Sequence, residues 1–172
     1  KVIYHHLSVL VKEKNKPIHE LLGKKNKEEF KAYSSLFRYG DPKIIEEKCK
    51  QSLDDGYQVI KLHEVEEKCI EAGGKGSGNI PLMLDVNCAW NYEETIAKKD
   101  FLQNMKLKWL EEPIYPPEDY ETLAKLSEEL GVPIACGENE FQIYGFKHLF
   151  DNKAVDVAMP DIGRVGGIQE TK

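Results

Sequence analysis

Short apolar segments alternate with helix-like segments from residue 31 onwards, and this alternation constrains the fold more than any other feature of the sequence. One apolar segment, residues 80–86 (IPLMLDV), is continuous, which is typical of a parallel strand covered on both faces. Strands that alternate with helices of this length predict βα units and a parallel sheet. We expect strands at residues 31–37, 57–63, 80–86, 107–110, 133–136 and 155–159.

The segments between these strands contain helix signals. Asp41 is a natural N-cap, and Pro42 suits the first helical position of a helix that runs to about Asp55. A glycine-rich stretch, residues 73–78, is expected to end the next helix in a flexible loop, and residues 163–167 are expected to form a tight turn into a last helix. The other expected helices are 64–72, 91–105, 117–130 and 141–151.

Residues 1–30 are less regular, and we interpret them as a remnant, with a helix and a turn, that precedes an incomplete barrel domain of residues 31–172. Both ends of the chain look incomplete, because it begins without Met and stops just after a glycine pair. A length of 172 residues suits one domain with a sizeable core.

Composition excludes several classes of protein. The formal net charge is −6 and Lys and Arg do not cluster, so we expect no binding of nucleic acid. No apolar run is long enough to span a bilayer, and residues 1–16 lack the cleavage site of a signal peptide. The four cysteines are far apart, which indicates reduced thiols rather than disulfides or a zinc site. These features predict a cytoplasmic protein.

Ionisable residues recur at the ends of the expected strands. Positions 61, 85, 111, 138 and 161 are 24, 26, 27 and 23 residues apart, and one βα unit is about that long. Five successive strands therefore place an ionisable residue at the same height, at the carboxyl ends where parallel barrels build their active sites. These residues are Lys61, Asp85, Glu111, Glu138 and Asp161, and the polar residues His63, Asn87, Glu112 and Asn139 follow the same strands.

Three carboxylates that converge at one depth repel each other, and a cation between them is the usual remedy. Oxygen ligands alone indicate Mg²⁺ or Mn²⁺ rather than Zn²⁺. Each residue also has an ordinary structural explanation. An acidic residue after a strand is commonly a helix cap, Lys61 could be a surface residue, and Glu112-Pro113 could simply mark the loop that ends a strand. The recurrence of an ionisable residue at five successive strand ends, with the spacing of one βα unit, favours the functional interpretation.

The motifs LMLDVN, WLEEP, GEN and MPDIGRVGG, in this order and spacing, resemble the mandelate racemase branch of the enolase superfamily. The resemblance covers residues 17–172 and implies a modified (β/α)₇β TIM-like barrel, of which this chain supplies about six parallel strands with helices outside. Asp85, Glu111 and Glu138 match the three Mg²⁺ ligands of the family. The resemblance also implies a homo-oligomer for the complete enzyme.

The same resemblance implies roles for the neighbouring residues. Lys61 matches the first lysine of a Lys-x-Lys motif, which neutralises the substrate carboxylate or supports the base, and His63 replaces the second lysine, the usual base. Asp161 matches the aspartate of an Asp–His dyad, and Asn87 is expected to bind substrate. Arg164 is expected to have a structural or anion-binding role, because arginine is a poor base.

The implied reaction is Mg²⁺-dependent abstraction of the proton α to a carboxylate, with stabilisation of the enediolate. A sugar-acid dehydratase is the outcome we favour, and a racemase or epimerase is the alternative. Two further possibilities stay open: a truncated, catalytically silent fragment that binds metal weakly or not at all, and a metal-dependent aldolase on an ordinary barrel. In the aldolase, Lys61 and Asp161 would have no role in the reaction.

Overall fold

The computed structural model describes residues 9–23 and 25–171, and its centre is one sheet of six parallel strands in the order β1 to β6. This confirms the predicted succession of βα units. The strands are shorter than predicted, because an apolar run marks buried backbone while only part of that backbone pairs with its neighbours. They are β1 (Ser34–Ser35), β2 (Ile60–Leu62), β3 (Leu82–Asp85), β4 (Leu110–Glu111), β5 (Ile134–Cys136) and β6 (Val157–Ala158).

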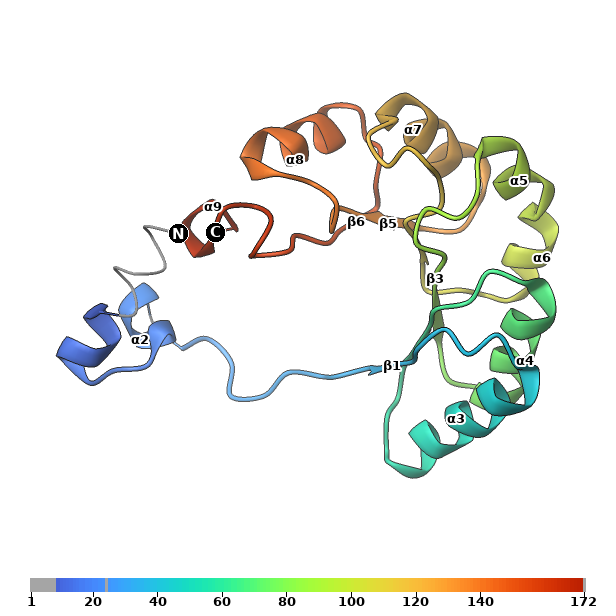
Figure 1. The fold of residues 1–172 in the computed structure, drawn as a ribbon, viewed down its shortest axis with the longest axis horizontal. Coiled ribbons are helices and arrows are strands. Elements are labelled where there is room, and N and C mark those ends of the chain that lie inside the picture. Colours follow the sequence, from blue (N-terminus) through green and yellow to red (C-terminus); the bar gives the residue numbers. More distant parts are fainter. Residues whose placement is uncertain (1–8, 24, 172) are drawn as a thin grey trace.

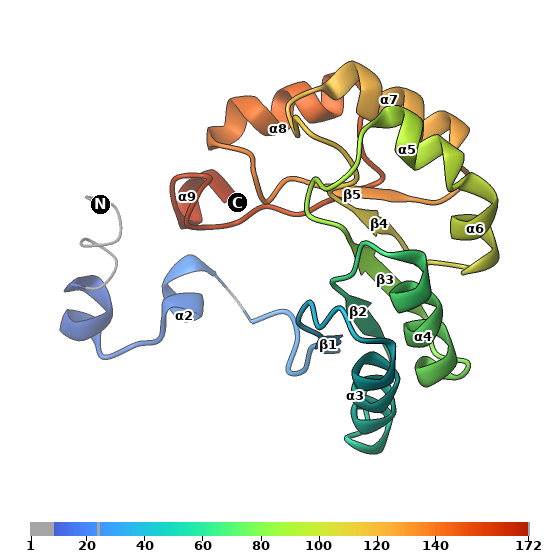
Figure 2. The same cartoon turned by 45° about the vertical axis from the view of Figure 1, so that its right-hand side comes forward.

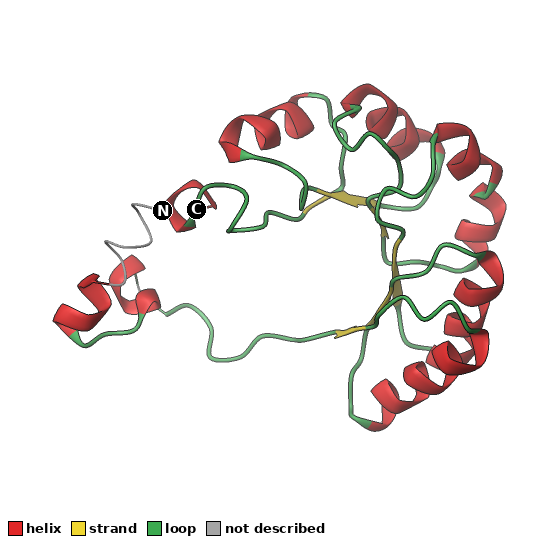
Figure 3. Cartoon of the chain, viewed as in Figure 1, coloured by secondary structure: helices red, strands yellow, loops and turns green. Residues whose placement is uncertain are grey.

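Helices α3 to α8 lie along the outer side of the curved sheet, so that strands and helices together form an open arc (Figure 1, Figure 3). The chain therefore has the architecture of a partial TIM-like barrel. The helices are α3 (Pro42–Asp54), α4 (Glu67–Ser77), α5 (Tyr92–Ala97), α6 (Lys99–Asn104), α7 (Tyr120–Glu129), α8 (Gln142–Asp151) and α9 (Ile168–Thr171). The turn before α9 agrees with the prediction for residues 163–167.

The N-terminal part is separate from this arc. Residues 9–14 are helical, α2 (Ile18–Leu22) follows, and residues 25–33 lead to β1 without helix or strand (Figure 2). Residues 1–8 of the predicted remnant lie outside the described part of the chain, and the proposed division after residue 30 stays a prediction. Among the described residues, no helix has the length and apolar character that crossing a membrane requires.

Helix α4 corrects the prediction of a flexible loop at residues 73–78, because the helix continues to Ser77. The glycines there allow close packing. A Cβ on Gly73 would lie 2.3 Å from Leu62 Cδ1, and one on Gly76 would lie 2.6 Å from the Glu46 carbonyl oxygen. The missing side chains therefore let α4 approach both β2 and α3, so this glycine run marks a helix contact rather than a helix end.

Helix ends differ from the predictions in two other places. The expected helix 91–105 is divided at Lys98, whose N–H donates to Thr95 O at 3.1 Å in a tightened turn. Helix α7 begins after Asp119, which accepts a hydrogen bond from the Thr122 N–H, rather than at Pro117. The predicted N-cap of α3 is confirmed, since Asp41 Oδ1 accepts from the Lys43 N–H at 2.8 Å.

The core lies between the sheet and the helices that cover it. It contains fully buried side chains from consecutive strands and helices, among them Leu62, Leu84, Leu110, Leu126 and Ile134. All four cysteines are free thiols, as predicted, and only Cys88 is partly exposed. The packed layers leave the carboxyl ends of the strands on one edge of the arc, where the next residues of each strand form the candidate site.

Candidate active site at the carboxyl ends of the strands

Asp85 and Glu111 lie side by side as the last residues of β3 and β4. They are paired in the parallel register of these two strands, so their backbones stand at one height. Asp85 is 3% exposed and Glu111 is 1% exposed. Carboxylates so well buried require compensating partners, because burial in a medium of low dielectric penalises their charge.

Lys61 supplies that compensation from the neighbouring strand. Its Nζ lies 3.1 Å from Asp85 Oδ2 and 2.8 Å from Glu111 Oε1. Lys61 pairs in register with Met83, which precedes Asp85 by two residues on the same face of the sheet. The Lys61 backbone therefore lies two residues further from the carboxyl edge than Asp85, and its long side chain extends toward that edge to contact the carboxylates. The prediction of a common height therefore holds for Asp85 and Glu111 but is wrong for Lys61.

One ammonium shared by two buried carboxylates leaves this group with a surplus negative charge. Burial lowers the pKa of Lys61, but the hydrogen bonds and charges of Glu111 and Asp85 outweigh it and raise the pKa overall. Burial raises the pKa of Glu111, and hydrogen bonds from Lys61 and Trp109 only partly oppose this effect. Trp109 Nε1 donates to Glu111 Oε2 at 3.0 Å. The carboxylate pair is therefore a place where additional positive charge is favourable.

Glu138 and Asn87 form a second contact across the same edge. Glu138 lies two residues beyond the end of β5, so it is not at the height of the carboxylate pair. Its Oε1 accepts a hydrogen bond from Asn87 Nδ2 at 3.3 Å, and the Asn87 N–H donates to Asp85 Oδ1 at 2.9 Å. Asn87 thus connects the Glu138 loop to the carboxylate pair, and its predicted contact with substrate stays a prediction.

His63 and Asp161 are at the same edge but outside this cluster. His63 is half-buried, and its carbonyl oxygen accepts a hydrogen bond from Arg38 Nε at 3.2 Å. Asp161 Oδ1 accepts the N–H groups of Gly163 and Arg164 at 2.8 and 3.0 Å, so it caps the turn that follows β6. Their catalytic roles stay predictions.

The donor set fits a hard divalent cation in its chemistry. Two carboxylate oxygens already converge on one positive charge, the Lys61 ammonium, and oxygen donors are those that Mg²⁺ and Mn²⁺ prefer. Within residues 9–23 and 25–171, no three His, Cys, Asp or Glu side chains are close enough together to hold a metal ion. The ligand set of Asp85, Glu111 and Glu138 therefore also stays a prediction.

Arg38 is a residue of this edge that the sequence analysis missed. Its Nε donates to His63 O, and its Nη2 donates to Val86 O at 3.2 Å, so the guanidinium bridges the ends of β2 and β3. Arg38 lies three residues after the end of β1 and directly follows the strand predicted at residues 31–37, so the rule that selected the other strand-end residues could have found it. Arg164, from the other side of the edge, donates through Nη1 to Asn139 Oδ1 at 2.8 Å.

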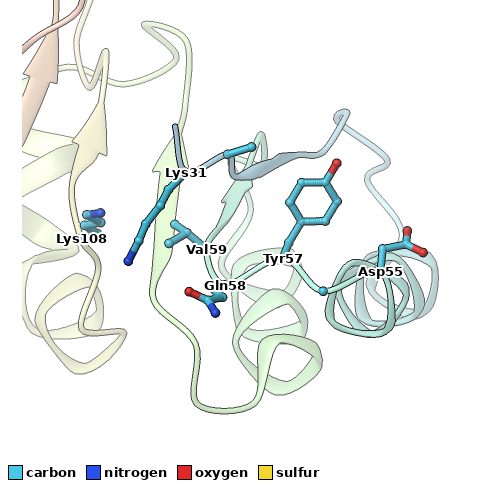
Figure 4. Close-up of a pocket in the computed structure, with 8 residues that line it drawn as sticks. Lys31, Asp55, Tyr57, Gln58, Val59 and Lys108 are labelled. Carbon is cyan, nitrogen blue, oxygen red and sulfur yellow. The ribbon is translucent and has the colours of Figure 1, made fainter. Parts of the chain in front are cut away.

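A hollow of about 520 Å³ lies at the opposite edge of the sheet (Figure 4). Its lining residues precede strands β1, β2 and β4, and include Lys31, Tyr57 and Lys108. The carboxylate pair follows its strands and does not line this hollow. This hollow and the ionisable cluster therefore lie at different edges of the sheet, and the chemistry of the side chains favours the carboxyl edge as the candidate active site.

The fold and the site together define a class: a parallel α/β barrel segment with acidic residues at the carboxyl ends of successive strands. Residues 45–172 match the family described as enolase C-terminal domain-like. The chain belongs to this family, which confirms the resemblance found in its motifs.

Curated relatives and a solved structure agree with this assignment. The chain is similar to a D-xylonate dehydratase of Haloferax volcanii, with 28% identity over 91% of this chain and 44% of the relative. It is also similar to an N-succinyl-L-Arg/Lys racemase of Bacillus cereus, with 26% identity over 93% of this chain and 45% of the relative. A crystal structure of an L-talarate/galactarate dehydratase mutant liganded with Mg and L-glucarate superposes with a TM-score of 0.83 and 26% identity, over 96% of this chain and 44% of that one. The chain thus spans about half the length of the relatives it matches.

Proposed function

We propose that this chain provides the metal-binding and proton-abstracting part of an enzyme that acts on a small carboxylate, most specifically as a sugar-acid dehydratase. The observation that best supports the proposal is the pair Asp85 and Glu111, buried at one height around a single cation. Two of the three relatives described above are sugar-acid dehydratases, which supports the choice of substrate class.

Asp85, Glu111 and Glu138 would hold Mg²⁺, or Mn²⁺, at the carboxyl edge. The bound ion would supply the positive charge that stabilises an enediolate formed from the substrate. Lys61 would be released from the two carboxylates, and its long side chain would then neutralise the substrate carboxylate. Asn87, which donates to Glu138 at present, would turn its amide toward the substrate.

The reaction begins when a base removes the proton α to the carboxylate. His63 is the base we propose on the β2 side, since a neutral imidazole accepts a proton near neutral pH. The electron pair of the broken C–H bond forms a C=C bond, and the β-hydroxyl leaves with a proton from an acid as water. We assign Asp161 as the second catalytic residue, on the side of the substrate opposite His63. Delivery of a proton to the opposite face of the planar enediolate, without loss of water, would instead give a racemase or epimerase; the Bacillus cereus relative is a racemase.

A calorimetric Mg²⁺ titration tests the metal site in this chain. We expect binding that Asp85→Ala abolishes, because this variant removes one of the two carboxylates that share Lys61. Asp41→Asn is a matched control, since Asp41 is a carboxylate that caps an outer helix. If the unmodified chain does not bind Mg²⁺, it is a silent fragment and the proposal fails for this chain.

A second experiment tests the reaction with the product of the complete gene. The protein is incubated with a set of acid sugars in D₂O, and NMR follows α-proton exchange and the appearance of a keto acid. Keto acid formation supports the dehydratase, and exchange without elimination supports the racemase or epimerase. If neither occurs with any acid sugar, the proposed reaction is wrong.

A further inference from the structure

Glu112 is a buried carboxylate next to the proposed ligand Glu111, and the functions assigned so far do not use it. It is 2% exposed, and within the described part of the chain it forms no ion pair. Its Oε1 accepts the Gly137 N–H at 2.9 Å, and its Oε2 accepts the Cys88 thiol at 3.6 Å. A carboxylate placed so deep without a cation requires an explanation other than charge pairing.

The partners of Glu112 belong to the two neighbouring strand ends. Cys88 follows Asp85 by three residues, and Gly137 directly precedes Glu138. The backbone adds to the connection, because the Cys88 N–H donates to Glu112 O at 2.7 Å and the Glu112 N–H donates to Ala135 O at 2.9 Å. One side chain thus joins the loops after β3 and β5 to the end of β4.

Backbone conformation indicates that this connection holds the loops in place. Asn87, Cys88 and Glu112 have φ values of +52°, +58° and +46°, in the left-handed region that residues other than glycine rarely adopt. Such conformations persist only where the surroundings hold them. The three residues lie beside the two carboxylates at the ends of β3 and β4, so the local strain surrounds the proposed metal site.

We infer that Glu112 is a positioning residue for the metal site, an inference that rests on the proposed function. Acting through Gly137 and Cys88, its carboxylate fixes the relative positions of the loop that follows Asp85 and the loop that bears Glu138. Hydrogen bonds outside the ligand shell of a metal site orient the ligands, and their loss commonly weakens metal binding by about 10- to 100-fold. Glu112 therefore sets the geometry of the site without contacting the ion.

Calorimetric Mg²⁺ titrations of Glu112→Ala and Glu112→Gln test this inference. We expect the alanine variant to bind at least about tenfold more weakly than the unmodified chain. The glutamine variant keeps an oxygen that accepts the Gly137 N–H, so we expect a loss below about threefold. Equal weakening in both variants would show that the negative charge of Glu112 matters rather than its hydrogen bonds, and unchanged binding in the alanine variant would also refute the inference.

Glu64→Ala is the matched control for these variants. Glu64 is also 2% exposed and also accepts backbone N–H groups, from Tyr39 at 2.7 Å and Gly40 at 3.3 Å, but it connects β2 to the loop after β1. We expect the Mg²⁺ affinity of this variant to change by less than about twofold. A loss equal to that of Glu112→Ala would mean that general destabilisation causes both effects.

Amide hydrogen exchange in the absence of metal provides a readout that is independent of the proposed function. We expect the Gly137 and Cys88 amides to exchange at least about tenfold faster in Glu112→Ala, and at nearly normal rates in Glu112→Gln. If the unmodified chain does not bind Mg²⁺, the proposed function fails, and these rates alone decide whether Glu112 holds the loops. Should Glu112→Ala not fold, Cys88→Ala replaces it, because it removes the thiol contact with Glu112, together with a weak contact from Asn139, and leaves the Gly137 contact in place. Unchanged exchange and unchanged affinity in that variant would refute the inference.

Discussion

Replacing Lys61 by Met tests whether the buried carboxylate pair depends on its single cation. The variant keeps a long apolar side chain but leaves Asp85 and Glu111 facing each other without a positive charge. The Lys61 side chain is 13% exposed, and those of Asp85 and Glu111 are 5% and 1% exposed. Removing one partner of a buried ion pair typically costs about 3–5 kcal/mol. Glu111 keeps its bond from Trp109, so we expect a loss near the lower limit, about 3 kcal/mol at pH 7.

The pH dependence of this loss has a definite sign. The pKa of Lys61 is raised in the folded chain, so its stabilising contribution is complete below its unfolded pKa of about 10.4 and is lost only as pH rises through the folded value. Burial raises the pKa of Glu111, so in the variant this carboxylate takes up a proton more readily than an exposed one and loses its unpaired charge as pH falls. The difference in unfolding free energy between the two proteins should therefore shrink as pH falls.

Urea unfolding followed by tryptophan fluorescence measures the effect, since Trp109 contacts Glu111 directly. Lys43→Met, at an exposed position on α3, is the control, and we expect a change within about 0.5 kcal/mol. Excess Mg²⁺ should restore part of the stability that Lys61→Met loses, because an ion that binds only the folded chain stabilises it. A loss below about 1 kcal/mol at pH 7 would refute the proposed dependence of the pair on Lys61.

Two other predictions concern packing and thiol chemistry. Gly76→Ala should lower the free energy of unfolding by about 1–3 kcal/mol, because the added Cβ would collide with the backbone at Glu46. Gly74→Ala should be tolerated, because its Cβ would meet only the flexible end of the Met105 side chain. Urea unfolding of both variants measures the difference, and equal stabilities would contradict the prediction. Burial, followed by the charge of Glu112, raises the pKa of Cys88 to about 12, so at pH 8 we expect iodoacetamide to label this partly exposed thiol at least about 100-fold more slowly than free cysteine. Mass spectrometry follows the labelling, and all four thiols should react once the chain is unfolded in urea.

Much of the fold could be predicted from sequence because the apolar period of a βα unit is a strong signal. The strand order and the parallel register follow from that period and from the connections between units. Residues 73–78 could not be predicted in the same way. Glycine usually ends a helix, and only the packed neighbours, Leu62 and the Glu46 carbonyl, reveal that these glycines lie at a close contact.

The positions of site residues could be predicted from sequence where the residue ends a strand, and less well where it lies in a loop. Asp85 and Glu111 end β3 and β4, so their common height follows from the pattern. Glu138 lies beyond the end of β5, and the path of the loop decides its position. For Glu112 the sequence indicates only a polar residue near a strand end, with a loop residue as the alternative, because a sequence does not show that its backbone takes a left-handed conformation and that its carboxylate is buried.

The carboxyl edge therefore contains an acidic pair, Asp85 and Glu111, and a single acidic residue, Glu112, and they are stabilised in different ways. Lys61 compensates Asp85 and Glu111 by charge, while Glu112 is held by hydrogen bonds from Gly137 and Cys88. A divalent ion bound at the pair would replace the ammonium, whereas Glu112 would keep its contacts. The loops would then keep their relative positions while Lys61 becomes free to meet a substrate carboxylate. Under the proposed function, metal binding and the availability of Lys61 would in this way be coupled through the two ion pairs that Lys61 forms.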